Sequence, residues 1–224
     1  MKKILIVSGA AGDLGRDVMK KASDSGYQPV GLDRIPSTNV RQVDLEDEQQ
    51  VRETFAQISS AVAGKPIGLV NCVGKYSGLK ASETTISEFV EIQMANVTTA
   101  WLCSKEFANI CEDNSIIINL ASISGRFGSK DVAYGTAKAA IIGLTKSLAL
   151  AYGPRIRVNA VAPGVIESHM LQNIPKKRAE DYKTASILGR HGTTEEVAEL
   201  IVNLVGPTSS WMTGAIIDVN GGFK

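Results

Sequence analysis

The sequence is poor in the residues that build metal sites and disulfide frameworks. Its 224 residues include only two histidines, His169 and His191, and three cysteines, Cys72, Cys103 and Cys111. The cysteines have neither paired spacing nor the spacing of metal ligands, which argues against both kinds of framework. Free thiols of this kind fit a reducing compartment, so we expect a cytoplasmic protein that binds no metal.

Excess charge and long apolar runs are also missing. The formal net charge is +1, so no long-range field attracts nucleic acid or an anionic membrane. No apolar run reaches the ~18 residues of a membrane span. We therefore expect neither a nucleic acid nor a membrane among the partners. The length and the hydrophobic content of 44% instead predict one ordinary domain with a substantial core.

Strand-like runs alternate with helical patterns along the chain. The strand-like runs cover residues 3–8, 28–32, 40–43, 67–72, 115–122, 156–161 and 215–219. Such alternation predicts a mainly seven-stranded parallel sheet with helices on both faces, a Rossmann-like doubly wound α/β fold in a single domain spanning 1–224. The pattern is irregular over about 165–190, and a structureless stretch of that length predicts a lid or substrate loop.

Tyr134 and Lys138 stand four residues apart at the start of an apolar, helix-forming run. At that spacing both side chains lie on one face of a helix, one turn apart. An ammonium beside a phenol favours the phenolate, so we expect Lys138 to lower the pKa of Tyr134 toward neutrality. Such a tyrosine exchanges a proton with a carbonyl or an alcohol. The same pair also occurs on surface helices without any role, but Ser122, at the end of the run SIIINLAS, would face the same cleft.

Gly9, Gly12 and Gly15 lie between a predicted strand and a predicted helix. In this context, backbone N–H groups and a helix N-terminus bind a pyrophosphate. The next strand closes with Asp33, where a carboxylate can accept a hydrogen bond from an adenosine ribose and repel a 2′-phosphate. The cofactor is therefore predicted to be NAD. Arg34 would suit a 2′-phosphate and keeps NADP possible.

Two polar residues have two explanations each. Asp44 either touches the adenine or caps a helix that begins near Glu46. Asn96 lies within the helical pattern of 87–110, where asparagine is a poor helix former. It either faces solvent or binds a water in the cleft through a local distortion of the helix.

Seven motifs occur in the order found in the short-chain dehydrogenases/reductases. They are the glycine turn, NCVG at 71–74, Asn96, the Ser122 strand, YGTAK at 134–138, VNAVAPGVIES at 158–168 and TGAIIDVNGG at 213–222. Together they span essentially the whole chain, which resembles the single-domain branch of that family. The resemblance implies an NAD(P)-dependent oxidoreductase that transfers a hydride between a nicotinamide and a carbonyl or secondary alcohol of a small molecule. It also implies a homo-oligomer, either a dimer or a tetramer.

The resemblance assigns roles residue by residue. Tyr134 is the general acid/base, Lys138 lowers its pKa and holds the nicotinamide ribose, Ser122 binds the substrate oxygen, and Asn96 anchors a water in a proton relay. The cofactor is placed along Gly9, Gly12, Asp13, Leu14, Gly15, Asp33, Arg34, Asp44, Leu45, Asn71, Cys72, Val73, Gly74, Tyr134, Lys138, Pro163, Gly164, Ile166 and Ser168.

Three departures from the family pattern matter. Asp13 stands where the single-domain branch has its middle glycine, and the resulting GxxGxxG spacing is typical of the extended branch of epimerases and dehydratases. The chain lacks the additional substrate domain of that branch, so the reductase hypothesis is kept. No room is left for a helix between Arg34 and Asp44. Ser122 and Tyr134 are one residue closer together than is common, which leaves Ser124 as a lesser candidate for the hydroxyl role.

Two other functions remain open. A non-catalytic dinucleotide-binding sensor or regulator would bind NAD without turnover, although it would not need Ser122, Tyr134 and Lys138 together. An isomerase or dehydratase that retains NAD would show turnover without net consumption of the cofactor. The segment 167–187 contains Met170, Leu171, Ile174 and Tyr182, and these residues predict only a partly apolar substrate.

Overall fold

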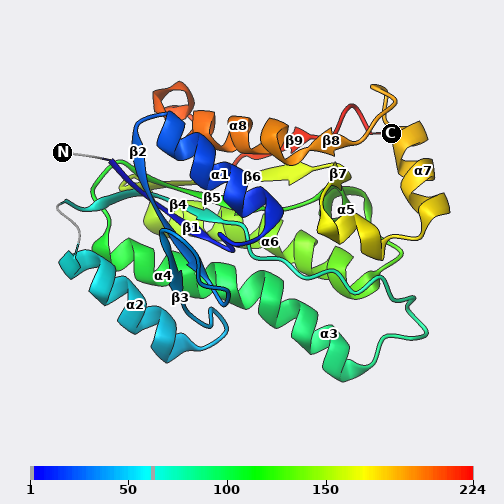
Figure 1. Cartoon of the computed structure of the whole chain (residues 1–224), viewed down its shortest axis with the longest axis horizontal. Coiled ribbons are helices and arrows are strands. Elements are labelled where there is room, and N and C mark those ends of the chain that lie inside the picture. Colours follow the sequence, from blue (N-terminus) through cyan, green and yellow to red (C-terminus); the bar gives the residue numbers. More distant parts are fainter. Residues whose placement is uncertain (1–2, 62–63, 224) are drawn as a thin grey trace.

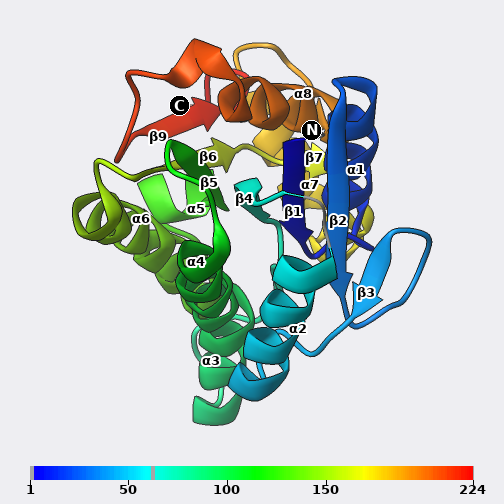
Figure 2. The same ribbon diagram turned by 90° about the vertical axis from the view of Figure 1, so that its left-hand side faces the viewer.

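A computed structural model describes residues 3–61 and 64–223. Within these residues a seven-stranded parallel sheet has the order β3-β2-β1-β4-β5-β6-β9 (Figures 1 and 2). Its strands are β1 (Lys3–Ser8), β2 (Tyr27–Asp33), β3 (Val40–Gln42), β4 (Pro66–Asn71), β5 (Ser115–Leu120), β6 (Ile156–Pro163) and β9 (Ile216–Val219). The predicted doubly wound α/β fold is confirmed.

Helices cover both faces of the sheet. One face carries α1 (Asp13–Asp24) and α8 (Thr194–Val205), and the other carries α2 (Glu48–Ala61), α4 (Thr99–Ile110) and α6 (Val132–Tyr152) (Figure 2). Because the central strands are buried on both sides, β1 and β5 are apolar nearly throughout, as KILIVS and SIIINL. Val18 and Ile201 fill the core on the first face, and Phe55 and Phe107 fill it on the second.

The predicted helix over 87–110 is interrupted near its middle. It consists of α3 (Ile86–Gln93), a π-helical turn η1 (Met94–Thr98) that includes Asn96, and α4. A π turn inserts an extra residue and is frequent at functional sites. Of the two alternatives for Asn96, solvent exposure is wrong, because the residue is buried, and the local distortion is confirmed.

The prediction of a structureless stretch over 165–190 is wrong. Residues 165–190, called the lid segment below after the predicted role, contain β7 (Ile166–Glu167), a 3₁₀ turn η2 (His169–Asn173) and α7 (Lys176–Ala185). Strand β7 pairs in parallel with β8 (Gly192–Thr193). The sequence pattern is irregular because α7, KKRAEDYKTA, buries none of its residues completely, so it lacks a continuous apolar stripe. No described helix is long and apolar enough to cross a membrane.

The edge of the sheet beyond β2 is short, as expected. Residues 34–39 connect β2 to β3 without a helix.

Asp44 does not cap α2: that helix begins at Glu48, and Asp47 caps it by accepting a hydrogen bond from the Gln50 backbone N–H at 3.0 Å. The cap alternative for Asp44 is therefore wrong. Two smaller elements complete the fold, α5 (Ile123–Phe127) and η3 (Pro207–Ser209).

Candidate active site

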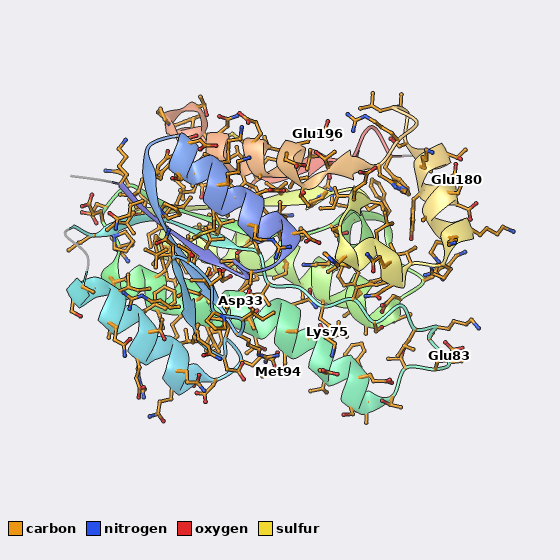
Figure 3. All side chains as sticks on the ribbon, in the orientation of Figure 1. Asp33, Lys75, Glu83, Met94, Glu180 and Glu196 are labelled. Carbon is orange, nitrogen blue, oxygen red and sulfur yellow. The ribbon has the colours of Figure 1, made fainter. Side chains whose placement is uncertain are left out.

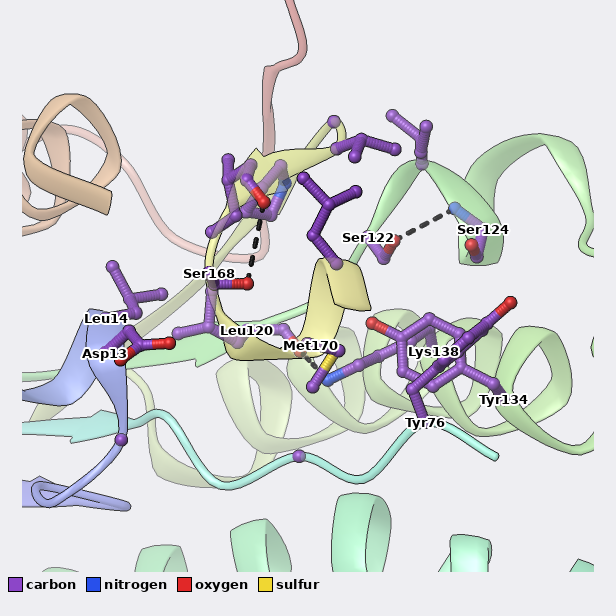
Figure 4. A pocket seen from close by; sticks show the side chains of 18 of the residues that line it. Asp13, Leu14, Tyr76, Leu120, Ser122, Ser124, Tyr134, Lys138, Ser168 and Met170 are labelled. Atoms are coloured by element: carbon purple, nitrogen blue, oxygen red, sulfur yellow. Dashed lines mark hydrogen bonds between the residues drawn. The ribbon is translucent and has the colours of Figure 1, made fainter. Parts of the chain in front are cut away.

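An inner cavity of about 330 Å³ lies between the carboxyl ends of the strands and the lid segment (Figure 4). This is where parallel α/β sheets bind their ligands. The predicted residues that line it are Gly9, Gly12, Asp13, Leu14, Gly15, Cys72, Gly74, Ser122, Tyr134, Lys138, Pro163, Gly164, Ile166 and Ser168. The topology therefore brings the glycine turn and the Ser122, Tyr134 and Lys138 group to one place.

An outer cavity of about 300 Å³ continues the inner one past β4. It shares Gly9, Gly12, Cys72 and Gly74 with the inner cavity and adds the predicted residues Asp33, Arg34, Leu45 and Val73. Asp33 and Lys75, both labelled in Figure 3, are among its lining residues. Because they share these four residues, the two cavities adjoin and form one groove.

The glycine turn requires its glycines at two positions. Gly9 has a φ of +71°, and a Cβ there would lie 2.7 Å from the Val73 backbone nitrogen. At Gly15 a Cβ would lie 2.1 Å from the Gly9 carbonyl oxygen. The turn therefore packs directly on β4 and on the start of α1. Gly12, at the N-cap of α1, has no side chain with which to cap the first N–H groups of that helix.

Asp13, the departure in the glycine motif, connects this turn to the lid segment. Its carboxylate accepts a hydrogen bond from the His169 backbone N–H at 2.7 Å and lies 2.9 Å from the His169 ring Nδ1. Arg16 donates to the same carboxylate at 2.6 Å. The hydrogen bond from the His169 backbone is the main cause that lowers the pKa of Asp13. A glycine could make none of these contacts.

The acidic end of β2 is tied to the glycine turn. Asp33 accepts hydrogen bonds from the Ala11 backbone N–H at 3.0 Å and from the Ile35 backbone N–H at 3.1 Å. Arg34 is paired with Asp44 at 2.8 Å and with Glu46 at 2.9 Å. The carboxylate of Asp44 is thus held by Arg34, and Asp44 lines neither cavity. The structure does not bring Asp44 to the groove.

Asn71 also points away from the groove. Its side chain is buried among other polar groups: it donates to the Asn119 side chain at 2.9 Å and to the Ser104 hydroxyl at 3.1 Å, and it accepts from the Ser8 hydroxyl at 3.2 Å. A buried amide with these partners joins β1, β4, β5 and α4. The prediction that Asn71 contacts the cofactor finds no support from the direction of its side chain.

The side-chain amide of Asn96 uses its nitrogen in hydrogen bonds, whereas its oxygen has no partner among the described residues. Its Nδ2 donates to the carbonyl oxygens of Lys75 and Ile92, both at 2.9 Å, which fixes the orientation of the amide. Its Oδ1 is buried and accepts no hydrogen bond from any described residue. A Cβ on Gly74 would lie 3.2 Å from this oxygen and 3.5 Å from Lys138 Nζ. The free acceptor therefore faces the same small space as the lysine.

Lys138 is buried beneath the cavity (Figure 4). Its Nζ donates to the Leu120 carbonyl at 2.9 Å and lies 5.6 Å from the centroid of the Tyr134 ring. Ser122 caps α5 by accepting from the Ser124 backbone N–H at 3.1 Å. Ser122 and Ser124 both line the inner cavity, so the structure leaves both hydroxyls as candidates for the substrate oxygen.

The proton affinities differ from the expected ones. Burial raises the pKa of Tyr134 to about 12, although the Ser122 hydroxyl acts in the opposite direction. Burial lowers the pKa of Lys138 to about 8. The expectation that Lys138 makes Tyr134 acidic near neutrality is wrong for this structure, because the loss of solvent around the buried phenol has the largest influence on its pKa and raises it. Tyr134 holds its proton at neutral pH.

Three comparisons place the chain among known proteins. A family model described as enoyl-(acyl carrier protein) reductase matches residues 20–224. A 3-oxoacyl-[acyl-carrier-protein] reductase of Aquifex aeolicus is 32% identical over 97% of this chain and 86% of its own length. The meso-2,3-butanediol dehydrogenase of Serratia marcescens is 25% identical over 98% of this chain and 94% of its own. A solved short-chain dehydrogenase/reductase from Serratia marcescens superimposes with a TM-score of 0.90 at 26% identity, covering 99% of this chain and 97% of the other.

The chain belongs to the short-chain dehydrogenase/reductase family. Members named above are reductases and dehydrogenases, and this short-chain dehydrogenase/reductase is accordingly an NAD(P)-dependent oxidoreductase that transfers a hydride between a nicotinamide and a carbonyl or secondary alcohol. The residues present fit such a cofactor, because the uncapped first turn of α1 offers N–H groups to a pyrophosphate and the groove is continuous from Asp33 to Tyr134.

The sequence did not indicate two residues that shape the site of this short-chain dehydrogenase/reductase. Tyr76 lines the inner cavity, and its ring lies edge-on to Tyr134, with 5.1 Å between centroids. Asp131 is completely buried and precedes α6. The spacing Asp131-Val132-Ala133-Tyr134 matches a helix N-cap, a signal that could have singled out Asp131. Tyr76 lies in a loop with no motif, and only the folded chain brings it to Tyr134.

Proposed function

We propose that Tyr134 gives the proton and Ser122 binds the oxygen when a carbonyl substrate is reduced in the inner cavity. The proposal rests on one observation: Ser122, Tyr134 and Lys138 converge on a cavity that continues into the glycine-lined groove. A nicotinamide dinucleotide in that groove supplies the hydride. The chain's own residues supply the proton, orient the oxygen and stabilise its developing charge.

The raised pKa of Tyr134 favours reduction. With a pKa of about 12, the phenol is protonated at neutral pH and is ready to protonate an alkoxide oxygen. Oxidation of an alcohol needs the phenolate, which becomes more abundant as the pH rises. We therefore expect the oxidation rate to increase with pH above neutrality, whereas the reduction rate holds until Lys138 loses its charge near pH 8.

We propose that Lys138 holds the nicotinamide ribose and that Asn96 holds a water beside it. The free, buried Oδ1 of Asn96 and its closeness to the space around Lys138 Nζ support this. A water that accepts a hydrogen bond from the Lys138 ammonium and donates one to Asn96 Oδ1 would link the two residues and could relay a proton to the lysine. The other predicted contacts to the cofactor that line the two cavities stay proposals on the basis of their place there. They are Gly9, Gly12, Asp13, Leu14, Gly15, Leu45, Cys72, Val73, Gly74, Pro163, Gly164, Ile166 and Ser168.

The cofactor is proposed to be NAD. Asp33 lines the outer cavity, and its carboxylate would repel a 2′-phosphate bound there. Arg34 is already neutralised by Asp44 and Glu46. A 2′-phosphate would have to compete with these two carboxylates for the guanidinium, which supports the proposal of NAD over NADP.

We also propose that the chain acts as one cofactor-binding domain in a cytoplasmic homo-oligomer, either a dimer or a tetramer. Leu150 on α6 is 87% exposed and Trp211 is fully exposed. Burial of these two large apolar side chains against another subunit would remove them from water, which supports this proposal. The lid segment (165–190) is proposed to shape the substrate pocket, because Met170, Leu171, Ile174 and Tyr182 line the inner cavity.

The substrate is proposed to be a small carbonyl or alcohol compound, and a two-substrate panel tests this. Meso-2,3-butanediol and a 3-oxoacyl thioester represent the compounds in the names of the two relatives. Each is offered with NAD or NADP in the appropriate redox state, and the absorbance of the reduced nicotinamide is followed. We expect turnover that the Tyr134→Phe variant lowers by about 10²- to 10⁴-fold. Near wild-type turnover by that variant contradicts the assignment of Tyr134.

The panel also separates the two alternatives. A sensor or regulator would bind NADH, detected by its fluorescence, without turnover of any compound in a broader set of alcohols and ketones. A cofactor-retaining isomerase or dehydratase would convert substrate with no net change in nicotinamide absorbance. The names of the relatives favour neither alternative over the oxidoreductase.

A further inference from the structure

Asp131 is a completely buried carboxylate that touches no described cation. Its exposed fraction is 0%, and its hydrogen-bond partners among the described residues are neutral N–H and O–H groups. A buried, unpaired charge costs several kcal/mol unless hydrogen bonds replace its hydration. Both of its oxygens are used, and each serves a different segment of the chain.

The Oδ1 atom of Asp131 belongs to the catalytic helix. It accepts a hydrogen bond from the Tyr134 backbone N–H at 3.0 Å, which caps the N-terminus of α6. A serine or threonine could do the same, as Thr85 does for α3 and Thr193 does for α8. The cap alone therefore does not require a carboxylate at this position.

The Oδ2 atom of Asp131 holds a loop more than 50 residues earlier in the chain. It accepts from the Ser77 hydroxyl at 2.7 Å, from the Gly78 backbone N–H at 2.9 Å and from the Ser77 backbone N–H at 3.2 Å. Three donors on one oxygen form a specific clamp, and only a residue with a second acceptor atom can make it while it also caps α6.

The clamped loop carries Tyr76 into the inner cavity. Its ring meets the Tyr134 ring edge-on, at an interplanar angle of 89°. Its hydroxyl accepts a hydrogen bond from Arg178 of α7 at 3.2 Å, so the same side chain also contacts the lid segment. Edge-on aromatic pairs stabilise a defined relative orientation. The position of the loop therefore decides where Tyr76 lies against Tyr134.

We propose that Asp131 is a positioning residue that holds Tyr76 against Tyr134 and thereby sets the substrate-facing wall beside the proton donor. This rests on the proposed function of Tyr134. Asp131 also affects the proton of Tyr134. Burial is the largest cause that raises the pKa of Tyr134, and the charges of Tyr76 and Asp131 raise it further. Asp131 thus both orients the phenol and helps to keep it protonated for carbonyl reduction.

The variant Asp131→Ser tests the clamp separately from the cap. Serine retains an acceptor for the Tyr134 N–H but loses the second oxygen and the charge. Hydrogen exchange at the Ser77 and Gly78 amides should become faster, and kcat/KM for reduction should fall by about 10- to 100-fold through misplacement of the wall. The rate of alcohol oxidation is expected to rise with pH, and in this variant the rise should begin at a lower pH. The reason is that the carboxylate no longer raises the pKa of Tyr134.

Two further variants make the test decisive. Ser77→Ala removes one of the three donors and leaves the charge, so we expect a smaller fall in kcat/KM, by about 2- to 5-fold, with an unchanged pH dependence of oxidation. This variant decides the outcome if Asp131→Ser does not fold. Thr85→Ala removes an exposed helix cap far from the cavity and serves as the control, with a lower melting temperature and unchanged kinetics.

The possible failures can be distinguished. If the wild type turns over neither panel substrate and no compound of the broader set of alcohols and ketones, the proposed function fails first, and the role of Asp131 falls with it. If the wild type is active and Asp131→Ser keeps its kcat/KM within about twofold and its pH dependence of oxidation unchanged, only the role of Asp131 is overturned. A loss of melting temperature without a change in these kinetic readouts would likewise reduce Asp131 to a helix cap.

Discussion

The two halves of the site are built in different ways. The cofactor half is the part of the groove that runs from Asp33 past the glycine turn to Lys138. Its residues lie on strand ends and near helix N-termini, so the sheet topology fixes its geometry. The substrate half is closed by the lid segment, whose helix α7 buries none of its residues completely. Three long-range contacts attach or frame this half: Asp13 with His169, Tyr76 with Arg178, and Asp131 with the loop at Ser77 and Gly78.

This difference has a functional consequence. Interactions in a buried, preorganised framework act strongly on bound charge, whereas exposed polar contacts contribute little each. The cofactor half should therefore tolerate few substitutions, and the lid segment should tolerate many with small effects. That division suits a family whose members act on different substrates, as the names of the two relatives show.

The largest expected effect comes from Lys138, in the cofactor half. Lys138→Met keeps the apolar stem and removes the charge, and we expect turnover to fall by on the order of 10²- to 10³-fold. The measurement is kcat on an active panel substrate. A variant within tenfold of the wild type would show that this half does not depend on a positive charge beneath Tyr134.

The same variant should be more stable than the wild type. Burial lowers the pKa of Lys138 from 10.5 to about 8, so the unfolded chain binds this proton more tightly and the folded state is disfavoured below pH 8. Replacing the lysine should raise the free energy of unfolding at pH 7 by on the order of 2 kcal/mol. This figure already subtracts the cost of losing the hydrogen bond to the Leu120 carbonyl. The gain should shrink as the pH rises from about 8 to 10.5, which urea unfolding at both ends of this range checks.

The sequence predicts the cofactor half well for a physical reason. Strand ends, glycine turns and the spacing of Tyr134 and Lys138 are local patterns, and the parallel topology then brings them together. Asn96 lies in a local helix distortion, as one of its two alternatives anticipated. The pKa of Tyr134 was not predictable, because burial is set by residues that arrive from distant segments, Tyr76 among them.

The helix and strand within the lid segment were not predicted, because the sequence there has no apolar periodicity. Its helix is polar, so the pattern favoured a loop, and the contacts that hold it come from Asp13 and Tyr76, far away in the sequence. The two alternatives predicted for Asp44, a contact to the adenine and a helix cap, found no support for a related reason. Its cap role was taken by Asp47, three residues along, while Arg34 engaged its carboxylate.

The next largest effect is expected at the glycine turn. In Gly15→Ala the new Cβ would lie 2.1 Å from the Gly9 carbonyl oxygen and 2.8 Å from the Ala10 Cα, both backbone atoms. The turn must shift, so NADH affinity, measured by fluorescence titration, should fall by about 10- to 100-fold, in line with the 1–3 kcal/mol cost of overpacking. Gly143→Ala, where a Cβ meets nothing within 4 Å, is the matched control. Equal affinities in the two variants would contradict the tight packing of this turn.

A moderate effect is expected from Asp33 on the choice of cofactor. Asp33→Asn keeps an acceptor for the Ala11 backbone N–H but removes the charge that would repel a 2′-phosphate. The ratio of kcat/KM with NADPH to that with NADH should rise by about tenfold. Arg34→Gln should not raise this ratio, because the guanidinium is already paired with Asp44 and Glu46. A loss of NADPH use in Arg34→Gln would instead assign Arg34 to the phosphate.

The smallest expected effect tests the attachment of the lid segment. Asp13→Gly restores the usual family glycine and removes the hydrogen bonds to His169, whose side chain is 79% exposed. An exposed contact of this kind is worth no more than about 1 kcal/mol, so substrate KM should rise by about two- to threefold while NADH affinity stays unchanged or improves. Because the pKa of Asp13 is lowered, the carboxylate stays charged across the neutral range, and the difference should vanish only as the pH falls through this lowered pKa. A tenfold weaker NADH affinity would move Asp13 from the lid contacts to the cofactor half, and the division between the two halves would have to be redrawn there.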